Sequence, residues 1–336
     1  VGWREVEEDR MASSVVGIEI GEESVRAVEV TRGHHPQLVA AGEVMLPAGS
    51  ARDSDVLDVD TVSVAVHQLW SQAKIKSRKV VVALANRRTL VRNYTAPNLP
   101  MVELAKALRY EAQDVIPVPV EEAVLDFYPL AIEGSHAKGL LVAGPADCVE
   151  SILATLAKAK VRTDTVDFLP FGLARVAGRV VPPGSGPVGV VAVGEHTSSF
   201  VVATDGIPRY VRIIAVDVLP GLRSEHVALD GDEPAVGRRT MTADALDPTV
   251  ADLIDRLSET LGFCRRQSPS LDPRQLLLTG ALAQTPNLAS AMAEELQIDV
   301  RTVQPADVID IGPKLAGTEL PSSLMGALGI TLGGGN

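Results

Sequence analysis

Apolar and polar residues alternate along residues 16–30 with the two-residue period of a β-hairpin. Residues 16–20 form one predicted strand and residues 28–30 belong to its return strand. Gly21 forms the corner, because glycine adopts backbone angles that other residues avoid. The amides of residues 22–24 would then point together, and such a turn binds an anion. The pattern therefore predicts a hairpin whose turn can hold a phosphate group.

The same pattern returns far downstream, at residues 190–203, and aligns with the first copy without a gap. The alignment places Gly194 on Gly21, Glu195 on Glu22 and Thr197 on Ser24. Taken singly, each copy is also typical of an ordinary β-hairpin with a polar turn. Two copies in register favour two related halves, each beginning with such a hairpin.

Hydrophobic spacing predicts the remaining elements. Further strands are expected at 37–46, 79–85, 90–94, 124–130, 140–145, 207–216 and 275–278. Helices are expected at 61–73, 101–114, 146–159, 249–267, 288–296 and 323–332, where apolar residues recur at intervals of three and four. Residues 48–60 are expected to form an acidic, mobile loop. The chain is thus predicted to be an α/β protein.

Turn-forming residues divide the chain into regions. The proline- and glycine-rich stretch 182–187 is the expected boundary between a first domain at 15–183 and a second at 184–336. Residues 1–14 are charged and poor in apolar side chains, which predicts a disordered leader. At 336 residues the chain is long enough for two domains.

Composition narrows the classes of function. Hydrophobic residues make up 46% of the chain and aromatic residues only 3%, which favours sheets covered by helices. Because 31 Lys and Arg residues face 43 Asp and Glu residues, the net charge of −12 argues against nucleic acid or anionic lipid as the main partner. Neither cysteine has a partner at metal-ligand spacing. With no signal sequence and no apolar run near the about 18 residues of a membrane span, we expect a cytoplasmic protein without a direct membrane span.

Two hydroxyl-bearing glycine turns resemble the phosphate clamp of the actin, hexokinase and Hsp70 superfamily. This resemblance implies an actin-like (ribonuclease H-like) two-domain fold. Residues 108–117 and 124–128 look like the inserted subdomain of the PilM family, which implies a small α+β insert at about 98–160. Residues 165–175 are similar to the connection between the two halves of that family. The family's nucleotide-contacting helix is not found at 223–247, so a reduced fourth subdomain is expected.

The superfamily resemblance implies ATP and Mg²⁺ between the halves. It assigns the nucleotide contacts to Glu19, Gly21, Glu22, Ser24, Arg26, Gly194, Glu195, Thr197 and Gly280, with Glu19 also as the magnesium ligand. The superfamily motif has an aspartate two residues before each turn glycine; here Glu19 and Ala192 stand there. Losing the second carboxylate argues against ATP hydrolysis, so no catalytic residue is assigned. Arg26 either reaches a phosphate or is an exposed strand cation.

The PilM resemblance implies an adaptor in type IV pilus assembly, peripheral to the inner membrane through partner proteins. It would bind the N-terminal cytoplasmic tail of a PilN-like inner-membrane protein and contact other pilus platform proteins. The groove residues expected from the resemblance are Leu108, Ala112, Val115, Ile116 and Val124; alternatively they pack the subdomain core. Two other functions stay open: an active ATPase, and a filament-forming protein like FtsA.

Overall fold

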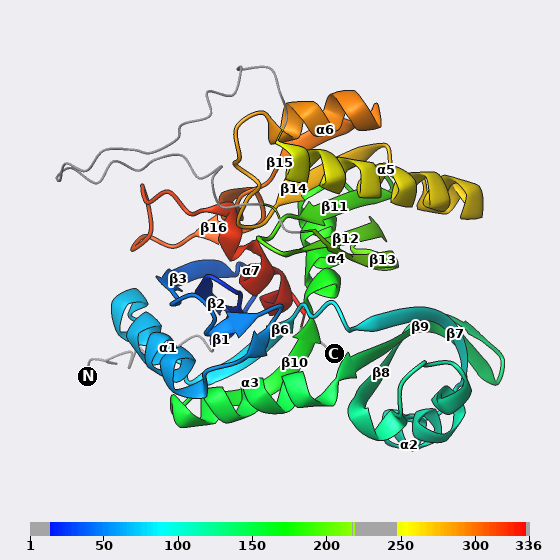
Figure 1. Cartoon of the computed structure of the whole chain (residues 1–336), viewed down its shortest axis with the longest axis horizontal. Coiled ribbons are helices and arrows are strands. Elements are labelled where there is room, and N and C mark those ends of the chain that lie inside the picture. The colour runs from blue at the N-terminus through cyan, green and yellow to red at the C-terminus, as the bar shows by residue number, and fades with distance from the viewer. Residues whose placement is uncertain (1–13, 217, 219–246, 334–336) are drawn as a thin grey trace, which may run out of the picture.

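The computed structural model describes residues 14–216, 218 and 247–333. Most of the predicted leader and of the hydrophilic region 223–247, where the reduced fourth subdomain was expected, lies outside the described residues. Figure 1 shows two halves stacked on each other, with a smaller subdomain beside the first half.

The first half contains a sheet in the order β10-β6-β1-β2-β3-β16. β1, β2 and β3 are antiparallel, whereas β1, β6 and β10 are parallel. The strands are β1 (Ser14–Ile20), β2 (Ser24–Thr31), β3 (Gln37–Met45), β6 (Lys79–Leu84), β10 (Arg162–Phe168) and β16 (Asp310–Ile311). One face packs against α1 (Val59–Ala73) and α3 (Ala146–Lys158) in a shared core. The side chain of Asp58 fixes the start of α1 by accepting from the amides of Asp60 and Thr61.

The second half repeats this design, with a sheet in the order β13-β12-β11-β14-β15. Its strands are β11 (Val188–Ala192), β12 (Thr197–Thr204), β13 (Ile207–Ala215), β14 (Gln275–Thr279) and β15 (Asp299–Thr302). α5 (Pro248–Gln267) and α6 (Leu288–Leu296) cover its outer face. The hairpin register is also the same: Glu19 pairs with Arg26 in β1–β2, and Ala192 pairs with Ser199 in β11–β12. The predicted internal repeat is confirmed.

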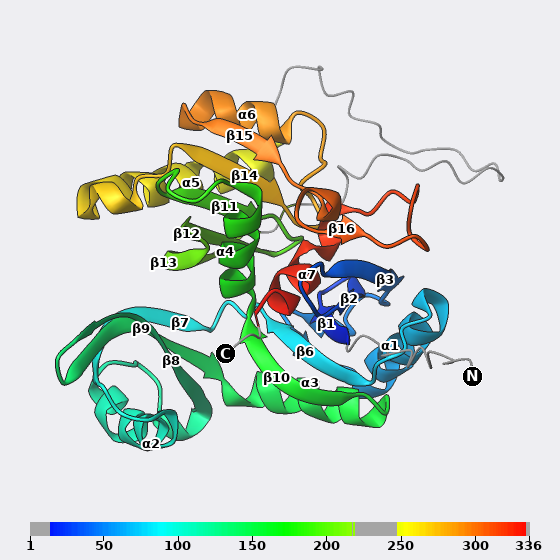
Figure 2. The same cartoon turned by 180° about the vertical axis from the view of Figure 1, so that it is seen from behind.

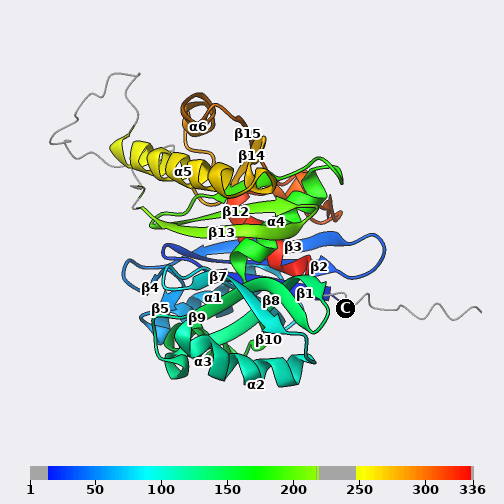
Figure 3. The ribbon, with the colours of Figure 1, turned by 90° about the vertical axis from the view of Figure 1, so that its right-hand side faces the viewer.

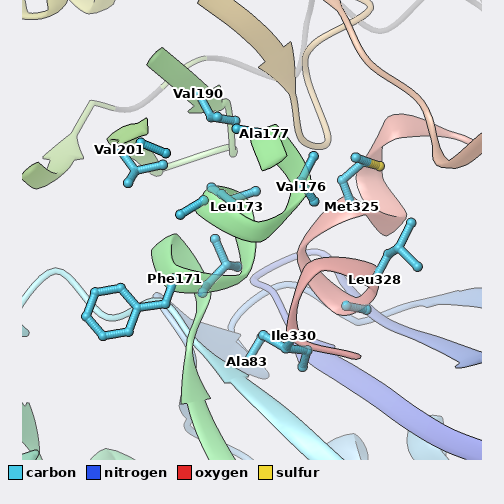
Figure 4. Packing of buried hydrophobic residues seen from close by; sticks show 14 of the residues in the cluster. Ala83, Phe171, Leu173, Val176, Ala177, Val190, Val201, Met325, Leu328 and Ile330 are labelled. Carbon is cyan, nitrogen blue, oxygen red and sulfur yellow. The ribbon is translucent and has the colours of Figure 1, made fainter. Parts of the chain in front are cut away.

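Two helices, α4 (Leu169–Val180) and α7 (Met325–Thr331), form the layer between the two sheets, as Figure 3 shows from the side. In Figure 4, Leu173 and Val176 of α4 lie in one apolar cluster with Leu328 of α7. The backbones touch because both helices carry glycine at the crossing: a Cβ on Gly172 would lie 2.9 Å from the carbonyl carbon of Gly329.

This layer departs from the predicted boundary at 183/184. α4 precedes the boundary in the chain but packs against β11, β12 and β13 of the second sheet. α7 and β16 follow the boundary but belong to the first half: α7 packs on β1, and β16 pairs with β3. A cut at the linker would therefore strip each half of a covering element.

The inserted subdomain is a sheet in the order β7-β9-β8 packed against one helix, visible in Figures 1 and 2 beside the first half. Its elements are β7 (Leu90–Pro97), α2 (Met101–Glu111), β8 (Ala123–Glu133) and β9 (His136–Pro145). The predicted extent of about 98–160 is shifted. β7 already belongs to the insert, whereas Ile152 and Leu156 of α3 pack in the core of the first half.

The prediction of a mobile loop at 48–60 is wrong, and the structure found there instead contributes to the site. Residues 51–56 form a small hairpin, β4 (Ala51–Arg52) and β5 (Asp55–Val56), and its tip residues Asp53 and Ser54 are buried. Short helical turns occur at η1 (Ala112–Asp114), η2 (Val120–Glu122), η4 (Pro269–Leu271), η5 (Pro305–Asp307) and η6 (Ser322–Leu324). Within the described ranges, no helix is long and apolar enough to cross a membrane.

Candidate functional site

The turns of the two repeated hairpins line one cleft between the halves. We call β1–β2 the first hairpin and β11–β12 the second hairpin. Gly21 and Gly194 both line this cleft, which has a volume of about 70 Å³. Eight of the nine predicted nucleotide contacts line this cleft, and Ser24 does not.

The two turn glycines are needed for space and not for unusual backbone angles. Neither Gly21 nor Gly194 has a positive φ, so the conformational argument made from the sequence is wrong. A Cβ on Gly194 would lie 2.5 Å from the carbonyl oxygen of Thr197. On Gly21 it would lie 3.1 Å from Arg26 Nη1 and 3.2 Å from the carbonyl oxygen of Ser24. The second turn is therefore tighter than the first.

Arg26 is the centre of charge in the cleft, and its side chain is 4% exposed. Its guanidinium lies 2.9 Å from Glu43 Oε1, 3.5 Å from Glu19 Oε1 and 3.3 Å from Glu195 Oε1. Burial acts to lower the pKa of Arg26, but the three carboxylates outweigh it and raise that pKa. The exposed strand cation considered as an alternative is thus wrong.

Glu43 is a site residue that the sequence analysis missed. It lies opposite Arg26 in the β2–β3 register, so correct strand pairing would have found it. Its carboxylate also accepts from Ser24 Oγ at 2.6 Å and from Ser323 Oγ at 3.0 Å. Burial acts to raise the pKa of Glu43, yet Arg26 and these hydroxyls bring it below its ordinary value. The Ser24 hydroxyl is therefore bonded to its own sheet.

Glu19 lies on the opposite side of Arg26, packed against the start of α7. A Cβ on Gly326 would lie 2.0 Å from Glu19 Oε2. Burial raises the pKa of Glu19 to about 7; Arg26 opposes this effect, and Glu195 and Glu43 add to it. In the part of the chain that the structure describes, no group of three or more His, Cys, Asp or Glu residues is arranged to hold a metal ion. Glu19 as a magnesium ligand stays a prediction.

Two further pairs connect the halves across the cleft. His196 Nε2 lies 3.1 Å from Glu22 Oε1. Thr197 Oγ1 donates a hydrogen bond to Asp53 Oδ1, and Asp53 Oδ2 lies 3.1 Å from Arg87 Nε. Asp53 is the second residue that the sequence missed, because its segment was taken for a mobile loop. The signal was the Asp-Ser pair at 53–54, since both residues adopt the positive φ of a tight hairpin turn.

Gly280 lies at the cleft, as predicted, with a φ of 98°. A Cβ there would lie 2.5 Å from the carbonyl oxygen of Val193, so only glycine lets this turn lie against the end of β11. Ser322 Oγ donates to the carbonyl oxygen of Gly280 at 3.0 Å. Gly280 therefore fixes the backbone next to the second turn.

The cleft in this arrangement is small and acidic for a magnesium nucleotide. Sites for small molecules enclose about 300 Å³ or more, whereas this cleft has about 70 Å³. Four carboxylates line it: two of them already contact Arg26, one contacts His196 and one contacts Arg87. The carboxylates are Glu19, Glu22, Asp53 and Glu195. A triphosphate would thus meet a small space with excess negative charge.

The predicted partner residues lie together in the inserted subdomain, but most are internal. Leu108, Ala112 and Ile116 are at most 6% exposed and pack with Leu104 and Phe127. Their assignment as partner contacts is wrong in this structure, because the subdomain core already covers them. In the same predicted set, Val115 is partly buried and Val124 is 48% exposed.

Comparison with known proteins identifies the family. The family model described as "Type IV pilus assembly protein PilM" matches residues 17–214, more than half of the chain. A chain of the solved PilM-PilN type IV pilus biogenesis complex is 25% identical, with 96% of this chain and 98% of that chain covered and a TM-score of 0.78. The ethanolamine utilization protein EutJ from Carboxydothermus hydrogenoformans shares the fold, at 12% identity over 96% and 90% of the two chains and a TM-score of 0.52. This chain is a member of the PilM family of type IV pilus assembly proteins and has the predicted actin-like α/β fold.

Proposed function

We propose that this chain is an adaptor that binds the short N-terminal cytoplasmic tail of a PilN-like inner-membrane protein. This contact would hold it at the cytoplasmic side of the inner membrane, within reach of other pilus platform proteins. The observation that carries the proposal is the likeness, along almost the whole of both chains, to a chain of a PilM-PilN complex. The matched length includes the inserted subdomain.

The surface of the inserted subdomain supports this proposal. Several of its large apolar side chains are at least 41% exposed: Met101, Val102, Tyr110, Val118, Val124 and Ile132. Strand β8 is at the edge of its sheet, so one side of its backbone can pair with an added strand. An extended tail would gain backbone hydrogen bonds along β8 and bury apolar side chains beside it.

The position of β8 favours the junction with the helical layer between the two halves as the binding region. Tyr128 of β8 packs on Phe171 of α4, with ring centroids 4.9 Å apart. Pro129 follows at a break in the β8–β9 register, which is typical of an edge strand. Of the predicted groove residues, Val115 and Val124 are the ones with exposed surface, and we propose that they contact the tail.

This role needs no ATP hydrolysis. Ala192 offers no second carboxylate, and the cleft between the turns has a volume of only about 70 Å³. Any residual ATP binding, as the family resemblance predicts, would require the two hairpin turns to separate first. Adaptor function and nucleotide binding can therefore be tested independently.

The test is a binding titration of the full chain with a labelled peptide of a PilN-like cytoplasmic tail, followed by fluorescence anisotropy. The double variant Val115→Asp/Val124→Asp should weaken binding about tenfold or more, because a carboxylate replaces each buried apolar contact. Val64→Asp is the matched control: Val64 is 67% exposed on α1, in the first half. Unchanged affinity in the double variant would refute the proposed region, and absent binding by the unmodified chain would refute the adaptor role.

A further inference from the structure

The carboxylate of Glu195, in the second turn, contacts the buried guanidinium of Arg26 in the first half. We propose that the carboxylate of Glu195 occupies the position on Arg26 that a phosphate of a ligand would take. A residue of the chain itself then blocks the phosphate-binding cleft between the two turns. Phosphate-bearing ligands then bind only after this ion pair separates. This inference does not depend on the proposed PilN-like partner.

The surroundings of Arg26 make Glu195 an effective competitor. Glu19 and Glu43 come from the strands next to Arg26, whereas Glu195 reaches it from 169 residues away in the sequence. Arg26 and Glu195 are 3% and 5% exposed, so little water screens their attraction. A carboxylate and a phosphate use the same fork of guanidinium donors. An entering phosphate must therefore displace Glu195.

Neighbouring contacts strengthen this closure. Residues 195–197 each contact the first half: Glu195 contacts Arg26, His196 contacts Glu22 and Thr197 contacts Asp53. The whole second turn is thus held against the first half by charged and hydrogen-bonded pairs. The excess of carboxylates along the cleft also repels an anion from outside. Removing one charge at Glu195 both frees a side of Arg26 and lowers this repulsion.

Isothermal titration calorimetry of the full chain with inorganic tripolyphosphate, and separately with ATP and Mg²⁺, tests the proposal. We expect the unmodified chain to bind both weakly, and Glu195→Gln to bind tripolyphosphate about tenfold tighter or more. Glu295→Gln is the matched control. It removes the same charge from the second half, but Glu295 is exposed on α6 and is not among the residues lining the cleft, so its affinity should equal that of the unmodified chain.

A second variant assigns the gain to Arg26. In Glu195→Gln/Arg26→Gln the tighter binding should be lost, because the cation that receives the phosphate is gone. Far-UV circular dichroism checks that each variant folds; if Glu195→Gln does not, Glu195→Asp retracts the carboxylate from Arg26 and should give a smaller gain. Micromolar binding of ATP and Mg²⁺ by the unmodified chain would overturn the proposal. The proposal would also be overturned if Glu195→Gln, or Glu195→Asp in its place, bound tripolyphosphate with the same affinity as the unmodified chain.

Discussion

The first and second hairpins share the same strand register, but the first has charged side chains at positions where the second has uncharged ones. In the first, three paired positions across β1, β2 and β3 are Glu19, Arg26 and Glu43. In the second, the equivalent positions across β11, β12 and β13 are Ala192, Ser199 and Ile213. One hairpin is thus built around a buried cation, and the other carries no charge at these positions.

This difference shows which features the two halves share. Strand order, register and turn length are kept in both halves, because each sheet needs them to bury its two faces. The charges at the paired strand positions are not kept, and the residue of the second hairpin that contacts Arg26 is Glu195 in its turn. The strands of the second hairpin pack in the core of the second half, while its turn contacts the first half.

The largest expected effect on this difference between the hairpins comes from the substitution Arg26→Met. The variant leaves three carboxylates without their buried cation, and we expect a loss of about 3–5 kcal/mol in the free energy of unfolding, measured by urea denaturation. Ser199→Ala changes the equivalent position of the second hairpin and should cost about 1 kcal/mol or less. Equal losses in the two variants would contradict the claim that the first hairpin alone carries a charged centre.

The glycines of the two turns give a second, smaller contrast. Gly194→Ala brings a methyl group to 2.5 Å from a carbonyl oxygen and should destabilise the fold by about 2 kcal/mol. Gly21→Ala meets its nearest atom, Arg26 Nη1, only at 3.1 Å and should cost less than about 1 kcal/mol. Thermal unfolding monitored by circular dichroism compares them directly. A larger effect at Gly21 would show that the first turn is the tighter one.

The sequence predicted the fold well, because periodicity and an internal repeat are local signals. The two hairpins, the helices at 249–267 and 288–296 and the buried strand at 275–278 all occur within a residue or two of their predicted bounds. β15 and β16 were missed because they are short and their residues are mostly exposed or half-buried. Which sheet α4 and α7 would cover was also not predictable, since it depends on contacts between distant segments.

For the site, the sequence located the residues but not their partners. Gly21, Arg26, Gly194 and Glu195 do lie at one cleft, as the repeat predicted. Glu43 and Asp53 were missed because their roles arise from pairing across strands and across halves, which spacing along the chain does not encode. For the same reason a superfamily motif could predict a phosphate clamp without showing that Glu195 fills it.

The smallest expected effect concerns Glu19, whose counterpart in the second hairpin is Ala192. Its pKa is raised from 4.5 to about 7, so the folded state holds a proton that the unfolded state releases, and this group's contribution to stability falls as pH rises from 4.5 to 7. Glu19→Gln removes the titration and should raise the free energy of unfolding at pH 8 by about 1 kcal/mol, less than the full shift implies because the attraction to Arg26 is also lost. Glu43 has a lowered pKa, so its contribution to stability is lost as the pH falls. This loss occurs in the Glu19→Gln variant and in the unmodified chain alike. Urea denaturation across this pH range should therefore show a shallower decline of the free energy of unfolding in the variant than in the unmodified chain. Parallel curves would mean that Glu19 is ionised throughout. The two hairpins would then differ less in the cost of burying these positions than their sequences suggest.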